Sequence, residues 1–344
     1  MGVAVFVFPA VKGYQAQKEY YITMVPLEII PRIFQFADEE LPPEIRSQRV
    51  LNKSRIPEMR DYILNNPDSY VFSSLTVSVD GDMEFVPTAQ DEPLIGHITI
   101  SMNARFLIND GQHRRAAIAE AIKKNSELKD EHISVVFYRD EGLLRSQQMF
   151  SDLNRYAIRP TKSINILFNS REESSIIAKD IIERVSVFQD LTEKENTTIS
   201  NRSKALFTLS AICNATERLL KDLKFDTEQK KNLAVEYWDC VASHISEWNR
   251  VKEGSLKPSD VRKSYICSLS LTLVALGHGG NSLLKSFPKS WRKALDALGQ
   301  MDWKKDNPVW VNLVFVNGKV AANRSTQQAM SKYIENLLME RAGE

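Results

Sequence analysis

The period of the hydrophobic pattern changes near the middle of the chain, and this change constrains the fold more than any other feature of the sequence. Up to about residue 170, short runs of Val, Ile, Phe and Tyr bounded by Gly, Pro, Asp and Asn alternate with stretches of helical spacing. From residue 171 the apolar residues recur at the helical period of ~3.6 residues. We therefore expect an α/β domain over residues 1–170, a mainly α-helical domain over 171–305, and a strand–turn–helix segment over 306–344 that packs back on the body.

The expected elements follow from local patterns. In the first part, strands are expected at residues 3–8, 20–25, 71–79, 96–100, 105–108 and 133–138, and helices at 27–36, 56–65, 111–125 and 141–154. In the second part, helices are expected at 172–188, 203–223, 227–248, 259–276 and 282–298, and a helix stop is predicted at Gly277, His278, Gly279 and Gly280. A strand at 310–316, a turn at Asn317 and Gly318 and a helix at 326–340 close the chain.

The charge balance excludes a chain-wide basic field. Lys and Arg number 45 and Asp and Glu number 44, for a net charge of +1, so any nucleic-acid contact must come from local clusters of cations. The three cysteines, Cys213, Cys240 and Cys267, form no Cys-x-x-Cys pair, which speaks against a zinc site and fits a reducing cytoplasm. The apolar run at residues 3–9 is too short for a secretory leader or a membrane span, so neither is expected.

A corner between a strand and a helix carries the most informative chemistry. A β-branched and aromatic run is followed by Asp110 and Gly111 and then by good helix formers. The unpaired N–H groups of a helix start attract anions, and glycine lets a ligand approach the backbone. His113, Arg114 and Arg115 fall in the first turn, where cations oppose the helix dipole, so their presence indicates an anionic ligand such as phosphate. The alternative is that Arg114 and Arg115 are solvated and that Asp110 only caps the helix.

His113 stands in this charged segment, unlike the other four histidines. It is a candidate phosphate donor or general acid/base, and the alternative is a side chain that packs against or caps the corner. His97, His132, His244 and His278 lack paired ligand spacing and are expected to be structural, so no metal site is predicted.

Two segments are locally basic and are candidate DNA contacts. The cations of the first are Arg46, Arg49, Lys53, Arg55 and Arg60, and those of the second are Lys285, Lys289, Arg292 and Lys293. Trp291 and Trp303, in and near the second segment, could stack on bases or fill the core. A helix-turn-helix made of residues 259–276 and 282–298, or a polar loop at 196–204, are further candidates, and the sequence does not choose between them.

Residues 110–114 spell Asp-Gly-Gln-His-Arg, and on this motif the chain resembles the DGQHR-domain family. The best-known members of that family are the DndB-type regulatory proteins of bacterial DNA phosphorothioation gene clusters. Residues 150–160, 265–277 and 310–318 are also similar to that family. The resemblance implies a cytoplasmic DNA-binding transcriptional regulator, a repressor that occupies the promoter of its own operon through basic side chains.

The corner is similar, more distantly, to the ParB partition-protein and sulfiredoxin superfamily, in which such a corner holds nucleotide phosphates. This similarity implies a mixed sheet with helices and a phosphate or nucleotide site, with ATP or CTP and magnesium as candidate cofactors. The residues it implies for that site are Asp110, Gly111, Gln112, His113, Arg114, Arg115, Asn154 and Arg155. Asp152 and Asn154 resemble the part of the ParB box that lies near the magnesium ion. Gln112 stands where sulfiredoxin has its reactive Cys, so repair of cysteine sulfinic acid is not expected.

Two other functions stay open. An enzyme, either a magnesium-dependent nucleoside-triphosphatase or a DNA-nicking enzyme, would centre on Asp110, His113 and Asp152. An interaction scaffold for the modification enzymes would bind neither DNA nor nucleotide. The regulator is favoured because no Ser-His-Asp or Cys-His arrangement is evident and the three cysteines lie in apolar helical contexts. Its expected partners are promoter DNA, other phosphorothioation proteins and, since symmetric operators favour dimers, a second copy of the chain.

Overall fold

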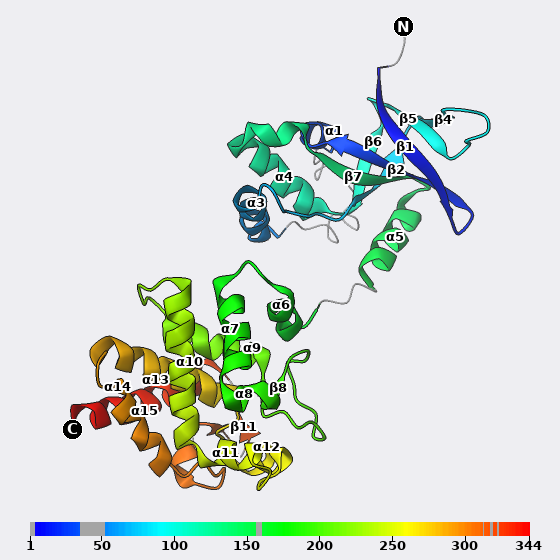
Figure 1. The fold of residues 1–344 in the computed structure, drawn as a ribbon. Coiled ribbons are helices and arrows are strands. Elements are labelled where there is room, and N and C mark those ends of the chain that lie inside the picture. The colour runs from blue at the N-terminus through cyan, green and yellow to red at the C-terminus, as the bar shows by residue number, and fades with distance from the viewer. Residues whose placement is uncertain (1–3, 35–51, 156–159, 312, 317–318, 322) are drawn as a thin grey trace. The chain divides into compact units, whose positions relative to one another are not determined.

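The computed structural model describes the chain except for residues 1–3, 35–51, 156–159, 312, 317–318 and 322 (Figure 1). The chain divides into two compact units, Met1–Ile158 and Arg159–Glu344, and each is described by itself. The first holds a mixed sheet with helices and the second is mainly helical, which confirms the expected fold class. Residues 162–168, which the sequence grouped with the first part, form a helix of the second unit.

The first unit is built on a seven-stranded sheet of order β4-β5-β1-β2-β7-β3-β6. Its strands are β1 (Val5–Gln15), β2 (Lys18–Pro26), β3 (Leu75–Asp80), β4 (Met83–Pro87), β5 (Ile95–Ser101), β6 (Arg105–Asp110) and β7 (His132–Arg139). Neighbouring strands pair antiparallel except β3 and β7, which are parallel. All six expected strands occur. Strand β4 was not expected from the sequence, because it is a short edge strand whose Glu84 and Pro87 weaken the strand pattern.

Helices cover one face of this sheet. They are α1 (Ile30–Ile33), α3 (Arg55–Asn65) and α4 (Gln112–Lys124), with the 3₁₀ turn η1 (Ser126–Asp130), and Figure 1 shows α3 and α4 side by side. Together with the sheet they enclose one apolar cluster in which Val25, Val77 and Phe137 are fully buried. The expected helix at residues 27–36 is only the short α1 within the described residues.

Helix α5 (Leu143–Arg155) packs against β6 on the other face. Ile108 faces the apolar cluster, so its neighbour Asn109 points to the opposite side of the sheet. There the Asn109 side-chain amide donates a hydrogen bond to the Ser78 hydroxyl (2.7 Å) and lies 3.1 Å from the Met149 sulfur. The buried Asn109 therefore ties β6, the strand that leads into the corner, to β3 and α5.

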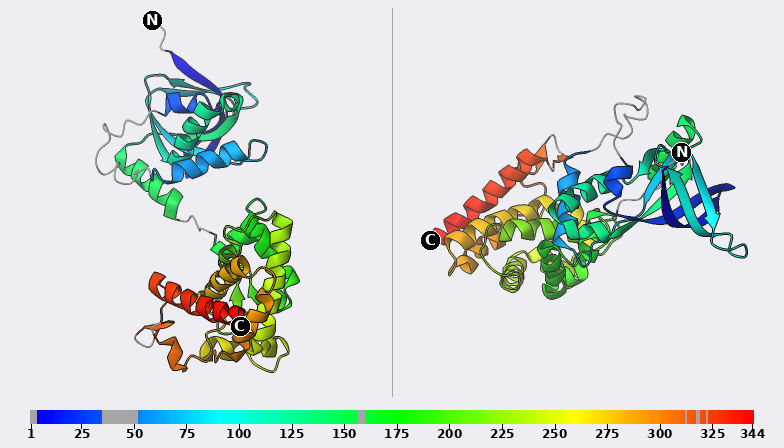
Figure 2. Two further views of the ribbon diagram at one scale, coloured as in Figure 1. Left: turned by 90° about the vertical axis from the view of Figure 1, so that its left-hand side faces the viewer. Right: turned by 90° about the horizontal axis from the view of Figure 1, so that it is seen from above.

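The second unit is a helical bundle around α13. Its helices are α6 (Lys162–Phe168), α7 (Glu173–Arg184), α8 (Ser186–Leu191), α9 (Leu209–Leu220), α10 (Thr227–His244), α11 (Ser246–Lys252), α12 (Pro258–Ser264), α13 (Ser270–Ser286), α14 (Trp291–Ala294) and α15 (Arg324–Gly343). The unit also contains the short 3₁₀ turns η2 (Leu295–Gln300) and η3 (Pro308–Trp310). Its short strands form pairs, β8 (Thr192–Glu193) with β9 (Phe207–Thr208) and β10 (Phe315–Val316) with β11 (Lys319–Val320). Helices α9 and α15 both lie against α13, and Figure 2 shows α15 beside it.

The helix stop predicted at the glycine cluster is wrong, because α13 runs straight through it. A Cβ atom on Gly277 would lie 2.0 Å from the Ala215 carbonyl oxygen of α9, and one on Gly280 would lie 2.4 Å from the Tyr237 ring of α10. Gly279 in turn faces α15. The glycines let neighbouring helices approach the backbone of α13 rather than ending it. The candidate helix-turn-helix made of residues 259–276 and 282–298 does not form for the same reason, because one helix spans the residues proposed for its turn.

Other expectations for the second unit also change. Trp291 and Trp303 are 2% exposed and fill the core, so the alternative in which they stack on bases is wrong for this structure. The expected strand at 310–316 is replaced by η3 and the short β10. The predicted turn at Asn317 and Gly318 lies outside the described residues.

Candidate functional site

The corner between β6 and α4 forms where the sequence predicts it. Strand β6 ends at Asp110, Gly111 has φ +101°, and α4 begins at Gln112. Positive φ values are rarely adopted by residues that carry a Cβ. At Gly111 a Cβ would also lie only 2.4 Å from Cδ2 of Leu75. Both the backbone conformation and the space beside it therefore require glycine here.

The Arg114 side chain lies in the corner and binds Asp110 and Ser73. Its Nη2 is 2.5 Å from Oδ2 of Asp110, and its Nη1 donates to the Ser73 carbonyl oxygen (3.0 Å) and to the Ser73 hydroxyl. The guanidinium lies across Gly111, with Nη2 and Nε at 3.2 and 3.3 Å from the position a Cβ would take. The Arg114 side chain is 12% exposed. A phosphate at Arg114 would compete with a carboxylate that is already bound there. The structure also differs from the alternative drawn from the sequence, because Arg114 is largely buried and Asp110 does not cap α4.

The remaining residues of the motif also make contacts within the fold. Gln112 donates from Nε2 to the Ile108 carbonyl oxygen (3.3 Å), and Nε2 of His113 accepts a hydrogen bond from the backbone N–H of Asn52 (3.0 Å). Burial, and then the positive charge of Arg55, lower the pKa of His113, so the imidazole stays neutral and can act as an acceptor. His113 thus makes a hydrogen bond within the fold, as the packing alternative drawn from the sequence requires.

Nη2 of Arg115 lies 3.4 Å from the Pro31 carbonyl oxygen, which joins α4 to α1. Ser73 and Asn52, the two residues that hold Arg114 and His113, were not expected from the sequence. They lie 41 and 61 residues away along the chain, and no local pattern connects them to the motif.

Two exposed cations flank this corner. Lys53 precedes α3 and Arg55 is its first residue, and the effect of Arg55 on His113 places it beside the corner. Neither has an ion pair or side-chain hydrogen bond with any residue that the structure describes. We call this pair the corner cations. Arg60, in contrast, is bound to Asp61 (2.8 Å) and Glu120 (3.2 Å) and joins α3 to α4. The two other cations of the first basic segment, Arg46 and Arg49, lie outside the described residues.

The residues expected beside a magnesium ion lie on α5. Asp152 accepts a hydrogen bond from the side-chain amide of Gln148 (2.7 Å), and Asn154 donates to the Phe150 carbonyl oxygen (2.8 Å). These bonds stay within α5, and Arg155 is the last residue of that helix. Within the described ranges, no group of three or more His, Cys, Asp or Glu side chains could hold a metal ion.

The second basic segment is partly neutralised. Arg292 donates to Glu236 (Nε–Oε1 2.8 Å) and its guanidinium lies 4.5 Å from the centre of the Trp291 ring. Lys285 is 3.9 Å from Asp222. The other two cations, Lys289 and Lys293, are exposed.

The thiols are poorly suited to nucleophilic chemistry. Cys213 and Cys267 are buried, and Cys240 is partly buried. Burial raises the pKa of Cys213 to about 11 and also raises the pKa of Cys240 and Cys267. The three groups therefore stay protonated near neutral pH, and a protonated thiol is a weak nucleophile.

Comparison with known proteins bears on the whole chain. A family model described as DndB, DNA-sulfur modification-associated, matches residues 8–340. No curated protein and no solved structure matches the chain, and the similarity to ParB and sulfiredoxin is not shown by these comparisons. Among the described helices, none combines the length and the apolar character needed to cross a membrane.

Proposed function

Since the chain belongs to the DndB family of DNA-sulfur-modification-associated proteins, we propose that it is a DNA-binding transcriptional regulator of such a system. It acts as a repressor by occupying the promoter of its own operon. Its partners are this promoter DNA, other proteins of the modification system and a second copy of the chain. It works in the cytoplasm, and its three free thiols agree with a reducing compartment.

The observation that supports DNA binding best is the pair of corner cations beside the start of α4. Lys53 and Arg55 are exposed, and no carboxylate within the described residues is bound to either. The first turn of α4 contains no acidic residue and its N-cap makes no side-chain hydrogen bond, so no side chain of that turn neutralises the positive end of the helix dipole. Two free cations at the positive end of a helix are suited to DNA phosphates.

In this proposal the DGQHR motif positions the surface rather than contacting the phosphate through Arg114. The Asp110–Arg114 pair fixes the start of α4, and the bond from Asn52 to His113 holds the segment before α3 against it. Arg55 is thereby held near the N-terminus of α4. The residues proposed to contact the phosphate are therefore Lys53 and Arg55 rather than Arg114.

The proposal is tested by fluorescence anisotropy with a duplex from the promoter of the protein's own operon. The variant Lys53→Ala/Arg55→Ala should bind more weakly at every sequence tested. Each lost phosphate contact should also reduce the slope of log affinity against log salt by ~0.9. The control is Lys123→Ala, an exposed lysine near the far end of α4, roughly 16 Å along the helix from Gln112. Equal affinity and equal salt slope for the double variant and the wild type would refute the assignment of the corner cations.

A further inference from the structure

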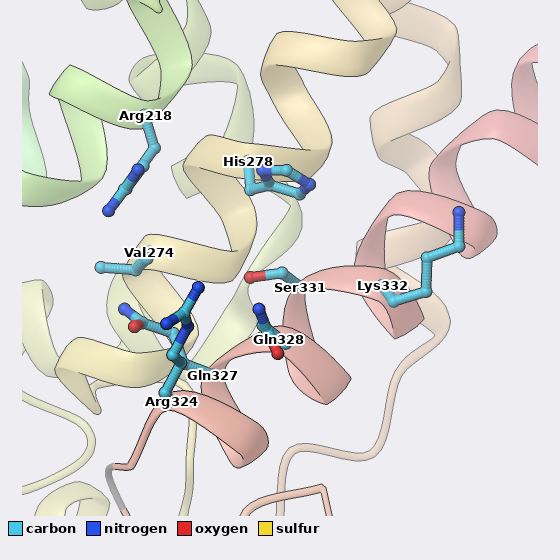
Figure 3. A pocket seen from close by; sticks show the side chains of 8 residues that line it. All are labelled: Arg218, Val274, His278, Arg324, Gln327, Gln328, Ser331 and Lys332. Atoms are coloured by element: carbon cyan, nitrogen blue, oxygen red, sulfur yellow. The ribbon is translucent and has the colours of Figure 1, made fainter.

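The second unit contains a pocket that the sequence did not indicate. It lies between α9, α13 and α15 and has a volume of about 660 Å³. Its lining residues are Arg218, Val274, His278, Arg324, Gln327, Gln328, Ser331 and Lys332 (Figure 3). Three of these eight residues are permanent cations, one is a histidine, and none is an acid.

Helix geometry explains why these residues meet. Residues 324, 327, 328, 331 and 332 are spaced by three and four, so they form one face of the first turns of α15. Val274 and His278 are four apart on α13, and Arg218 comes from α9. Figure 3 shows Arg218 and Arg324 extending from opposite sides toward the same space. The two guanidinium groups therefore flank one opening, although they lie more than a hundred residues apart in the chain.

One carboxylate beside the pocket is already bound. Oε1 of Glu335 accepts a hydrogen bond from the Ser282 hydroxyl (2.6 Å), and Oε2 lies 3.1 Å from Nζ of Lys332 and 4.0 Å from Nε2 of His278. The hydrogen bond from Ser282, and then that from Lys332, keep the pKa of Glu335 below its ordinary value, so it stays negative. Glu335 thus compensates Lys332.

Arg218 and Arg324 have no such compensation. Both side chains belong to exposed residues, and neither forms an ion pair or a hydrogen bond with another part of the chain that the structure describes. Arg324 is also the first residue of α15, whose first turn has no acidic residue. A cation there is unfavourable for the helix dipole, and a bound anion would remove that penalty.

We propose that this pocket binds a small phosphorylated molecule of nucleotide size. Arg218 and Arg324 bind the phosphate groups through charge-assisted hydrogen bonds, and the amides of Gln327 and Gln328 hydrogen-bond to the polar edge of the remainder. The volume falls within the range of about 300–1,000 Å³ that is usual for small-ligand sites and is too small for a DNA duplex. The site belongs to the second unit alone, so the inference does not depend on the DNA contact proposed for Lys53 and Arg55.

The test is isothermal titration calorimetry on the full chain, with ATP, CTP and pyrophosphate as separate probes. The wild type should bind at least one nucleotide, and binding by pyrophosphate as well would show that phosphate groups alone suffice. Each lost charge-assisted contact should weaken binding about tenfold or more, so Arg218→Ala/Arg324→Ala should abolish measurable binding. Arg250→Ala, which removes an exposed arginine of α11, should bind as the wild type does.

Further measurements keep the outcome decisive. The double variant should unfold at the wild-type temperature because both arginines are exposed, and Arg218→Lys/Arg324→Lys should recover part of the affinity because the charges return. Nucleotide binding that is unchanged in the double alanine variant would overturn the proposal, as would absence of binding for all three probes at millimolar concentration. DNA affinity that falls in the double variant, without any nucleotide binding, would also overturn it and would assign these arginines to DNA.

Discussion

Replacing Arg114 by alanine separates the two roles that its position allows. In the structure Arg114 holds Asp110 and Ser73 together across Gly111, so its loss should destabilise the first unit. If Arg114 instead bound a phosphate, its loss should weaken ligand binding and leave the stability nearly unchanged. The control is Arg105→Ala, which removes an exposed arginine from the other end of β6.

The magnitude follows from the surroundings of the two partners. The Arg114 side chain is 12% exposed but that of Asp110 is 44% exposed, so the pair lies between an exposed ion pair, worth about 0–1 kcal/mol, and a buried one, whose disruption costs about 3–5 kcal/mol. The charged hydrogen bond to the Ser73 carbonyl oxygen adds to this, although the exposed Ser73 regains water. Removing a cation from the first turn of α4 returns about 0.3–1 kcal/mol. We expect Arg114→Ala to lower the free energy of unfolding by about 1–2 kcal/mol.

Urea unfolding followed by circular dichroism measures this change. Arg105→Ala should stay within about 0.5 kcal/mol of the wild type. A double-mutant cycle with Asp110→Asn should give a coupling energy of about 1 kcal/mol, since the two side chains are in direct contact. Wild-type stability for Arg114→Ala, together with loss of DNA or nucleotide binding, would show that the ion pair is incidental and that Arg114 is a ligand.

Three further outcomes are expected. Gly277→Ala should lower the free energy of unfolding by about 1–3 kcal/mol in a thermal or urea assay, because the added methyl group meets the backbone of α9. The control Gly299→Ala, whose Cβ would have its nearest neighbour at 3.5 Å, should be nearly neutral. Equal free energies of unfolding for the two variants would contradict the close packing of α13 and α9. Because the pKa of His113 is lower in the folded than in the unfolded chain, stability should fall as the pH drops below about 6.5, and His113→Gln should flatten that slope in urea unfolding measured across pH; a slope that persists would implicate another group. Cys213 and Cys267 should resist a thiol reagent in the native protein and react after unfolding, and rapid labelling without denaturant would disprove their burial.

The corner was predictable because its signals are local. A β-branched run, a glycine and a series of helix formers within a few residues determine where β6 ends and α4 begins. The partners of the motif were not predictable in the same way. Ser73 and Asn52 reach Arg114 and His113 only after the chain has folded, and the sequence alone could not show that the cation of the motif was already bound.

The helical unit shows where local patterns mislead. A cluster of glycines usually ends a helix, but in α13 it serves contacts with α9, α10 and α15, and tertiary packing outweighs the low helix propensity of glycine. The expected single helices at 172–188 and 227–248 are each broken in two, at Val185 and Ile245, where the chain turns to bury both segments. The sequence did not indicate a binding site at Arg218 and Arg324, because these residues lie more than a hundred positions apart and no local pattern contains both.

The backbone contact of Gly277 with α9 has a consequence for recognition. Because Gly277 and Gly279 carry no side chain, α9 and α15 lie close to the backbone of α13, and a Cβ added at either position would meet them. The distance between the helices that bear Arg218 and Arg324 is therefore set before any ligand arrives. In the proposed pocket, a change at either glycine would therefore alter both the spacing of Arg218 and Arg324 and the stability of the second unit.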